Sequence, residues 1–81
     1  MGKEEKHVVT GTVTRQRART GTASEHLAVV IHTEDGERLI LQRIGGNPFQ
    51  DAQTENLVGR RVRVSGFRLG DILRYATAEE A

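Results

Sequence analysis

The sequence predicts an all-β protein with one short helix, folded as a small, curved five-stranded barrel. The prediction begins with the C-terminal half, where residues 57–67 alternate small apolar and polar side chains as a half-buried strand does. Residues 68–75 follow as a short returning strand, which completes a hairpin. Strand patterns of the same kind occur three times earlier in the chain, at residues 7–14, 26–33 and 37–44.

The 81 residues are expected to form one domain, because they leave no room for a second hydrophobic core. Such a domain buries about 60–65% of the surface of its unfolded chain, so its stability depends on good closure of the barrel or on pairing with another copy. The chain has no cysteine, which excludes disulfides and thiolate metal sites. We expect the domain to span residues 7–77, with tails at residues 1–6 and 78–81.

The first strand pattern, residues 7–14, is rich in β-branched residues around Gly11, which suits a strand that bends sharply. Residues 15–24 are polar and contain glycine, so we expect the strand to fray there into a basic loop. Its three arginines alternate along the chain and would project from one side of a continued strand: Arg15, Arg17 and Arg19. A mobile basic loop has little structural purpose, and we interpret these arginines as ligand contacts.

The second and third strand patterns form a hairpin whose register follows from their apolar residues. A two-residue turn would divide those residues between both faces, whereas a three-residue loop with Gly36 in the left-handed conformation collects them on one face. The second register places Ile31 opposite Leu39 and Val29 opposite Leu41. The inner face then carries Leu27, Val29, Ile31, Leu39 and Leu41, and the outer face carries Ala28, Val30, His32, Arg38, Ile40 and Gln42.

A short helix is expected between the third and fourth strands. Gly45 and Gly46 break the chain, Asn47 is a plausible N-cap, and Pro48 fits the first helical position. Residues 49–56 are long enough for about two helical turns, and Gly59 suits the exit from the helix.

This order of five strands, with a bent first strand, the helix after the third strand and a final hairpin containing Val62-Arg63-Val64-Ser65-Gly66, resembles an OB-fold. That family is a Greek-key barrel used widely for binding oligonucleotides. The resemblance covers about residues 8–77 and implies that a ligand lies across the outer face of the second and third strands. The residues implied there are Ala28, Val30, His32, Arg38, Ile40 and Gln42, flanked by Arg15, Arg17 and Arg19 on one side and Arg68 on the other.

The chain departs from that family in its aromatic residues, which are only Phe49, Phe67 and Tyr75, none of them on the second or third strand. Base stacking on aromatic rings contributes about 1–3 kcal/mol per base in single-strand binders. We therefore expect nucleic acid to bind chiefly through its phosphates, weakly and with little sequence preference.

Charge along the chain supports an anionic partner. The formal net charge is +1, but residues 7–78 carry ten arginines against seven acidic residues, a net charge of +3. Arginine binds phosphate in bidentate fashion and stacks on flat rings. A solvated arginine-rich surface without a partner explains the same composition.

The arginines near the final hairpin also have two interpretations. With Val62 and Val64 inward, Arg61 and Arg63 point outward with Phe67, which makes a basic stripe beside one ring. Their long side chains could equally cover the apolar barrel wall and deter edge pairing. We expect Tyr75 to pack at the rim of the barrel rather than to stack on a ligand.

No set of residues points to a catalytic or metal site. His26 and His32 are six residues apart, roughly 20 Å along a strand, so they cannot share one ion. Glu34, Asp35 and Glu37 gather at the tip of the hairpin, where a turn explains them. Ser24 and Ser65 have no assignable base. We expect a non-enzymatic protein without a cofactor. No apolar segment follows the charged N-terminus or approaches the roughly 18 residues of a membrane span, so we expect a cytoplasmic protein that does not contact a membrane.

Two functional hypotheses follow, from different classes. The first is a module that binds single-stranded DNA or RNA through an arginine-lined groove formed by Arg15, Arg17, Arg19, Arg38, Arg61, Arg63 and Arg68. The second is a protein-interaction module, in which a homodimer or another chain covers Val30, His32, Ile40 and Phe67 or pairs with a free strand edge. A small anionic ligand at the mouth of the barrel is a third reading that no specific residue favours.

Overall fold

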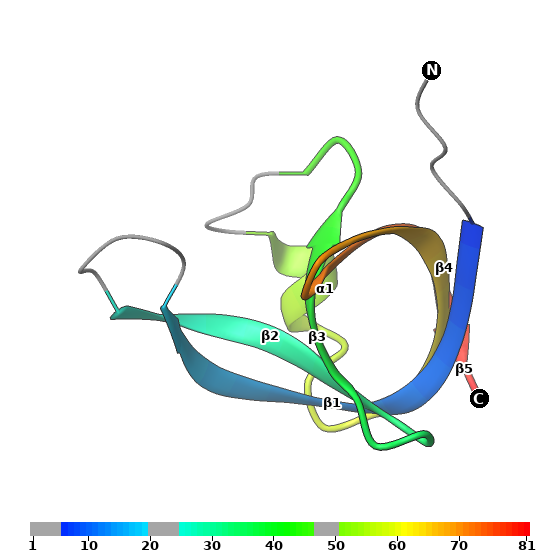
Figure 1. Ribbon diagram of the computed structural model, residues 1–81, viewed down its shortest axis with the longest axis horizontal. Coiled ribbons are helices and arrows are strands. Elements are labelled where there is room, and N and C mark those ends of the chain that lie inside the picture. The colour runs from blue at the N-terminus through cyan, green and yellow to red at the C-terminus, as the bar shows by residue number, and fades with distance from the viewer. Residues whose placement is uncertain (1–5, 20–24, 47–50) are drawn as a thin grey trace.

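Five strands close into a barrel in the computed structural model, which describes residues 6–19, 25–46 and 51–81 (Figure 1). The order around the ring is β1-β2-β3-β5-β4, with β3 and β5 parallel and every other pair antiparallel. The elements are β1 (Lys6–Arg19), β2 (Glu25–Thr33), β3 (Arg38–Arg43), α1 (Ala52–Glu55), β4 (Arg61–Leu69) and β5 (Ile72–Glu80). The predicted all-β class, with a short helix between the third and fourth strands, is confirmed.

The register predicted for the β2–β3 hairpin is also confirmed. Ile31 lies opposite Leu39, and Gly36 in the connecting loop has a φ of 91°, the left-handed conformation that a glycine adopts at little cost. The predicted inner residues of this hairpin that have described side chains, Val29, Ile31, Leu39 and Leu41, are all buried.

The barrel interior is filled by branched aliphatic side chains from every strand. Val13, Ile31, Leu39, Val62, Val64 and Leu73 have at most 1% of their surface exposed, and Val29, Leu41 and Tyr75 complete the cluster. Removing these side chains from water is the main stabilising contribution available to a chain without disulfides.

Two glycines allow the strands to approach closely where the barrel curves. A Cβ on Gly11 would lie 2.0 Å from the carbonyl oxygen of His32, and one on Gly66 would lie 2.0 Å from that of Arg74. Gly66 borders a β-bulge in which Ala76 is the extra residue, since Ser65 pairs with Thr77 and Gly66 with Tyr75. β1 can therefore wrap from β2 to β4, as the predicted bend at Gly11 requires.

Several boundaries differ from the predictions. The strand predicted over residues 57–67 begins only at Arg61, because residues 57–60 form the turn that follows α1. The helix is shorter than residues 49–56 and begins after Asp51, whose side chain accepts a hydrogen bond from the backbone N–H of Gln53. The predicted cap at Asn47 and Pro48 lies outside the described residues. β1 continues as strand to Arg19, where a loop was expected, because residues 11–19 pair with β2. β5 reaches Glu80, so residues 78–80 pair with β4 instead of forming a tail.

Candidate functional site

The outer face of the barrel wall is continuous from β2 to β4. In one row across the strands, Val30 lies opposite Ile40, Ile40 opposite Ile72, and Ile72 opposite Leu69. In the neighbouring row, Gln42 lies opposite Arg74 and Arg74 opposite Phe67. Closure of the barrel therefore brings Phe67 onto the surface that β3 and β5 share, although it is absent from β2 and β3.

Part of the predicted interaction face is not accessible. Val30 is only 5% exposed and Ala28 only 7%, although both have the outward parity. Above them the Nε2 atom of His32 lies 2.9 Å from the Oγ1 atom of Thr14 and 3.0 Å from the Nε2 atom of Gln16. The expectation that Val30 offers an exposed apolar surface is wrong, because β1 runs alongside β2 and its polar side chains close over this row.

Arg15, the arginine of β1 whose side chain is described, does not flank this outer face. Arg15 lies opposite Val29, which faces the interior, and its guanidinium forms an ion pair with Glu55 of α1. Arg17 and Arg19 share the register parity of Arg15, opposite Leu27 and Glu25, and their side chains lie outside the described set. The expected flanking position is therefore wrong for Arg15, since the strand keeps the alternation set by its buried residue Val13.

Three other predicted arginines are held by carboxylates. Arg61 pairs with Glu34, Arg63 pairs with Glu79 at 2.7 Å, and Arg68 contacts both carboxylate oxygens of Glu37 at 3.1 Å. These pairs are solvent-exposed, and exposed pairs contribute roughly 0–1 kcal/mol each. They nevertheless neutralise the positive charge that the sequence predicts at those positions.

Two arginines on the outer face differ from these three in their ion pairing. Within the described part of the chain, neither Arg38 nor Arg74 has a carboxylate within ion-pair distance. Both side chains are exposed, and they lie on adjacent strands of the same face, β3 and β5. Arg38 is among the predicted contacts, whereas Arg74 is not, since only the β3–β5 pairing shows that it belongs to this surface.

An apolar groove lies beside Arg74. Its lining is Ile44, Phe67, Leu69 and Arg74, and its volume is about 230 Å³. Leu69 is 52% exposed and Ile44 39% exposed, although side chains of this kind are usually covered. Of the three apolar residues only Phe67 is among the predicted contacts, because Ile44, in the turn after β3, and Leu69, at the end of β4, meet only in the closed barrel.

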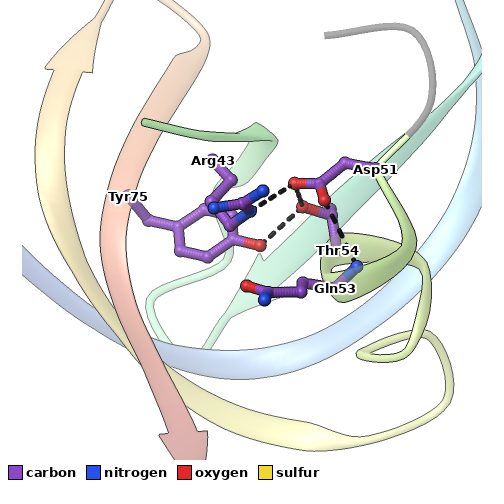
Figure 2. A network of polar contacts seen from close by, with 5 residues as sticks. All are labelled: Arg43, Asp51, Gln53, Thr54 and Tyr75. Atoms are coloured by element: carbon purple, nitrogen blue, oxygen red, sulfur yellow. Dashed lines mark hydrogen bonds and ion pairs between the residues drawn. The ribbon is translucent and has the colours of Figure 1, made fainter. Parts of the chain in front are cut away.

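A second cluster of polar side chains lies at the end of the barrel that α1 covers (Figure 2). The Nε–H of Arg43 donates to the Oδ2 atom of Asp51 at 2.7 Å, and the Oγ1–H of Thr54 donates to the same atom at 2.9 Å. Because the single hydroxyl proton of Thr54 is used on the carboxylate, the hydroxyl of Tyr75 donates to Thr54 Oγ1, at 2.5 Å. The chain of bonds joins β3, α1 and β5.

The charges in this cluster stabilise one another. The hydrogen bond from Arg43 lowers the pKa of Asp51, and the same bond raises the pKa of Arg43. Burial raises the pKa of Tyr75, which keeps its hydroxyl protonated as a donor. Among the described residues, every buried side-chain nitrogen and oxygen has a partner. The cluster therefore holds α1 against β3 and β5. Both oxygens of the Asp51 carboxylate accept hydrogen bonds within it.

Residues 6–19, 25–46 and 51–81 contain no group of three or more histidine, aspartate or glutamate side chains placed to hold a metal ion. None of their helices is long and apolar enough to cross a membrane.

No protein-family model matches the chain, and neither a curated protein nor a solved structure is significantly similar to it.

Proposed function

We propose that the protein is a non-enzymatic OB-fold module that binds single-stranded DNA or RNA across the outer face of β3 and β5. The strand order, the parallel β3–β5 pair and the helix between β3 and β4 support the resemblance to that family. Since unrelated functions share such barrels, the proposal rests on the site and not on the fold.

The observation that carries the proposal is a pair of exposed arginines, Arg38 and Arg74, that have no carboxylate partner among the residues that the structure describes. Arg74 of β5 lies opposite Gln42 of β3, and Gln42 is four residues after Arg38 on that strand. Four residues of strand correspond to about 13 Å, which lets two separate phosphates of one strand contact them. The paired arginines elsewhere on the barrel would first have to leave their carboxylates.

The test is a titration of a fluorescent mixed-sequence single strand at low and at physiological salt. Each phosphate contact contributes about −0.7 to the log–log salt slope on single strands, so the double variant Arg38→Ala/Arg74→Ala is expected to lose affinity and to flatten the slope by about 1.4. The matched control is Arg60→Ala/Arg63→Ala, which removes the same charge from residues that pair with Glu80 and Glu79.

Equal losses in the two double variants would contradict the proposal, because a general electrostatic attraction would then explain the binding. Absence of binding by the wild-type protein at low salt would also reject it.

A protein-interaction module is the second candidate, favoured by the exposed apolar side chains Ile44, Leu69 and Val8, the last 57% exposed. In that case a dimer measured by analytical ultracentrifugation should respond little to salt and should dissociate in the variant Leu69→Lys. A monomer at micromolar concentration would remove the self-association form of this candidate.

A further inference from the structure

The groove beside Arg74 combines three apolar walls with one charged end. Phe67 of β4 lies directly opposite Arg74 of β5, and Leu69 lies two residues further along β4. Ile44 closes the other side, where its backbone N–H donates to the carbonyl oxygen of Tyr75 at 2.9 Å. Strand pairing therefore fixes Phe67, Leu69 and Arg74, while Ile44, the first residue of the turn after β3, is fixed by this one backbone hydrogen bond.

The size and lining of the groove suit one flat ring. Its volume of about 230 Å³ is below the roughly 300–1,000 Å³ of pockets that hold drug-sized ligands. Phe67 offers an aromatic ring, and the branched side chains of Ile44 and Leu69 can cover the edges of a ring stacked on it. A nucleobase has this shape, and every base has a π-face on which to stack.

The charged end of the groove distinguishes a nucleotide from an apolar protein side chain. Arg74 has no carboxylate within ion-pair distance among the described residues, whereas Arg68 on the neighbouring strand is held by Glu37 and by the carbonyl oxygen of Gly70. A guanidinium at the rim of an apolar groove complements a ligand that joins a flat ring to an anion.

We propose that this groove is a base-binding subsite, in which one nucleobase of a single strand stacks on Phe67 between Ile44 and Leu69 while Arg74 contacts the adjoining phosphate. The inference rests on the proposed single-strand binding and adds that bases, and not only phosphates, contribute to it.

The experiment compares two labelled strands of equal length and charge, oligothymidine and its abasic analogue, by fluorescence anisotropy at one salt concentration. The wild-type protein is expected to bind the base-containing strand at least about 5-fold more tightly, the lower limit of one base–aromatic stack. The variant Phe67→Leu keeps an apolar side chain and is expected to lose this preference while binding the abasic strand as the wild type does.

Arg74 has its own matched pair of variants. Arg74→Gln is expected to flatten the salt slope by about 0.7 for both strands, whereas Arg74→Lys keeps the charge and the slope. Thermal unfolding of all three variants checks that they fold, which the partly exposed positions of Phe67 and Arg74 favour.

The outcomes separate the two proposals. Equal affinity for both strands, or an equal loss for both in Phe67→Leu, overturns the base-binding subsite and leaves phosphate binding standing. No binding of either strand overturns both proposals. A salt-insensitive dimer that dissociates in Leu69→Lys, together with no strand binding, assigns the groove to an interface between two copies.

Discussion

Arg74 and Tyr75 are neighbours on β5, yet they belong to two chemically opposite regions. Tyr75 is 3% exposed and points into the barrel, where its hydroxyl completes the chain of hydrogen bonds through Thr54 to Asp51. Arg74 points outward into an apolar groove and has no carboxylate partner within the described ranges. In the inner region every buried side-chain nitrogen and oxygen of the described residues has a partner, whereas the outer region leaves a charge available.

The comparison separates polar groups that stabilise the fold from those that can serve a ligand. Buried donors and acceptors are costly when unpaired, so the fold must pair them. An exposed guanidinium remains hydrated, and the fold can leave it free. A variant of the inner region should therefore alter stability more than binding, and a variant of the outer region should do the reverse.

The largest effect is expected from Gly66→Ala, which disturbs both regions. The new Cβ would lie 2.0 Å from the carbonyl oxygen of Arg74 and 2.4 Å from the Cα of Tyr75, so β4 and β5 must separate at the bulge. We expect a loss of about 3 kcal/mol in the free energy of unfolding, measured with urea. The control is Gly36→Asn, where nothing lies within 4 Å and asparagine tolerates the left-handed conformation. Similar midpoints for the two variants would show that the close approach at Gly66 is not required.

A smaller effect is expected in the inner region from Asp51→Ala, at about 1–2 kcal/mol of stability, because the helix loses its N-cap and Arg43 and Thr54 lose an acceptor. Asp51→Asn isolates the charge, since asparagine caps a helix equally well. Neither variant should change the affinity for a single strand by more than about 2-fold, because the cluster lies at the end of the barrel that α1 covers and the groove lies on the outer face.

The pH dependence of stability tests whether the ionised form of Asp51 stabilises the fold. The pKa of Asp51 is lowered from its ordinary value of 3.8 by Arg43, so its contribution is complete above about pH 4 and is lost as the pH falls through the lower folded value. The difference in urea midpoint between the wild type and Asp51→Asn should therefore shrink on acidification. A difference that stays constant down to the acid transition would contradict the charge assignment.

The smallest effect on stability, below about 1 kcal/mol, is expected from Glu34→Gln/Glu79→Gln, which frees Arg61 and Arg63 in the outer wall. If pairing decides which arginines bind, this variant should bind a single strand more tightly, with a salt slope steeper by about 1.4. Asp35→Asn/Asp71→Asn is the matched control, because it changes the net charge equally and no ion pair to Asp35 or Asp71 occurs in the described part of the chain. Equal gains in both variants would show that net charge alone matters.

The fold was predictable where local pattern and packing agree. Alternation along the β2–β3 hairpin, together with Gly36, was sufficient for the register that pairs Ile31 with Leu39. The bulge at Ala76 was not predictable, because the sequence Ala76-Thr77-Ala78 carries no turn residue and the extra residue is needed only to fit β5 against β4. The helix start was misplaced because Asn47 and Pro48 offer a stronger local signal than Asp51, whose side chain caps the helix and also accepts a hydrogen bond from Arg43 of β3.

The site was less predictable than the fold, since it depends on contacts between distant residues. Nothing near Arg15 in the sequence indicates that Glu55 neutralises it, and nothing near Val30 indicates that β1 covers it. Arg74 becomes part of the outer face only through the parallel pairing of β5 with β3. Residue types gave the chemistry of the surface, and barrel closure decides which side chains meet on it.

The strand order β1-β2-β3-β5-β4 has a consequence for how the chain folds. β5 is the last strand in sequence, but it occupies the gap between β3 and β4, so the ring cannot close until residues 72–80 are available. Pairings of such long sequence separation form slowly, in milliseconds to seconds for barrels of this type. Until β5 has been synthesised and has paired, β3 and β4 each expose an unpaired edge. Such edges are templates for pairing between chains. Aggregation of nascent chains is therefore the hazard inherent in this topology, and a chaperone that shields strand edges should raise the yield of folded protein.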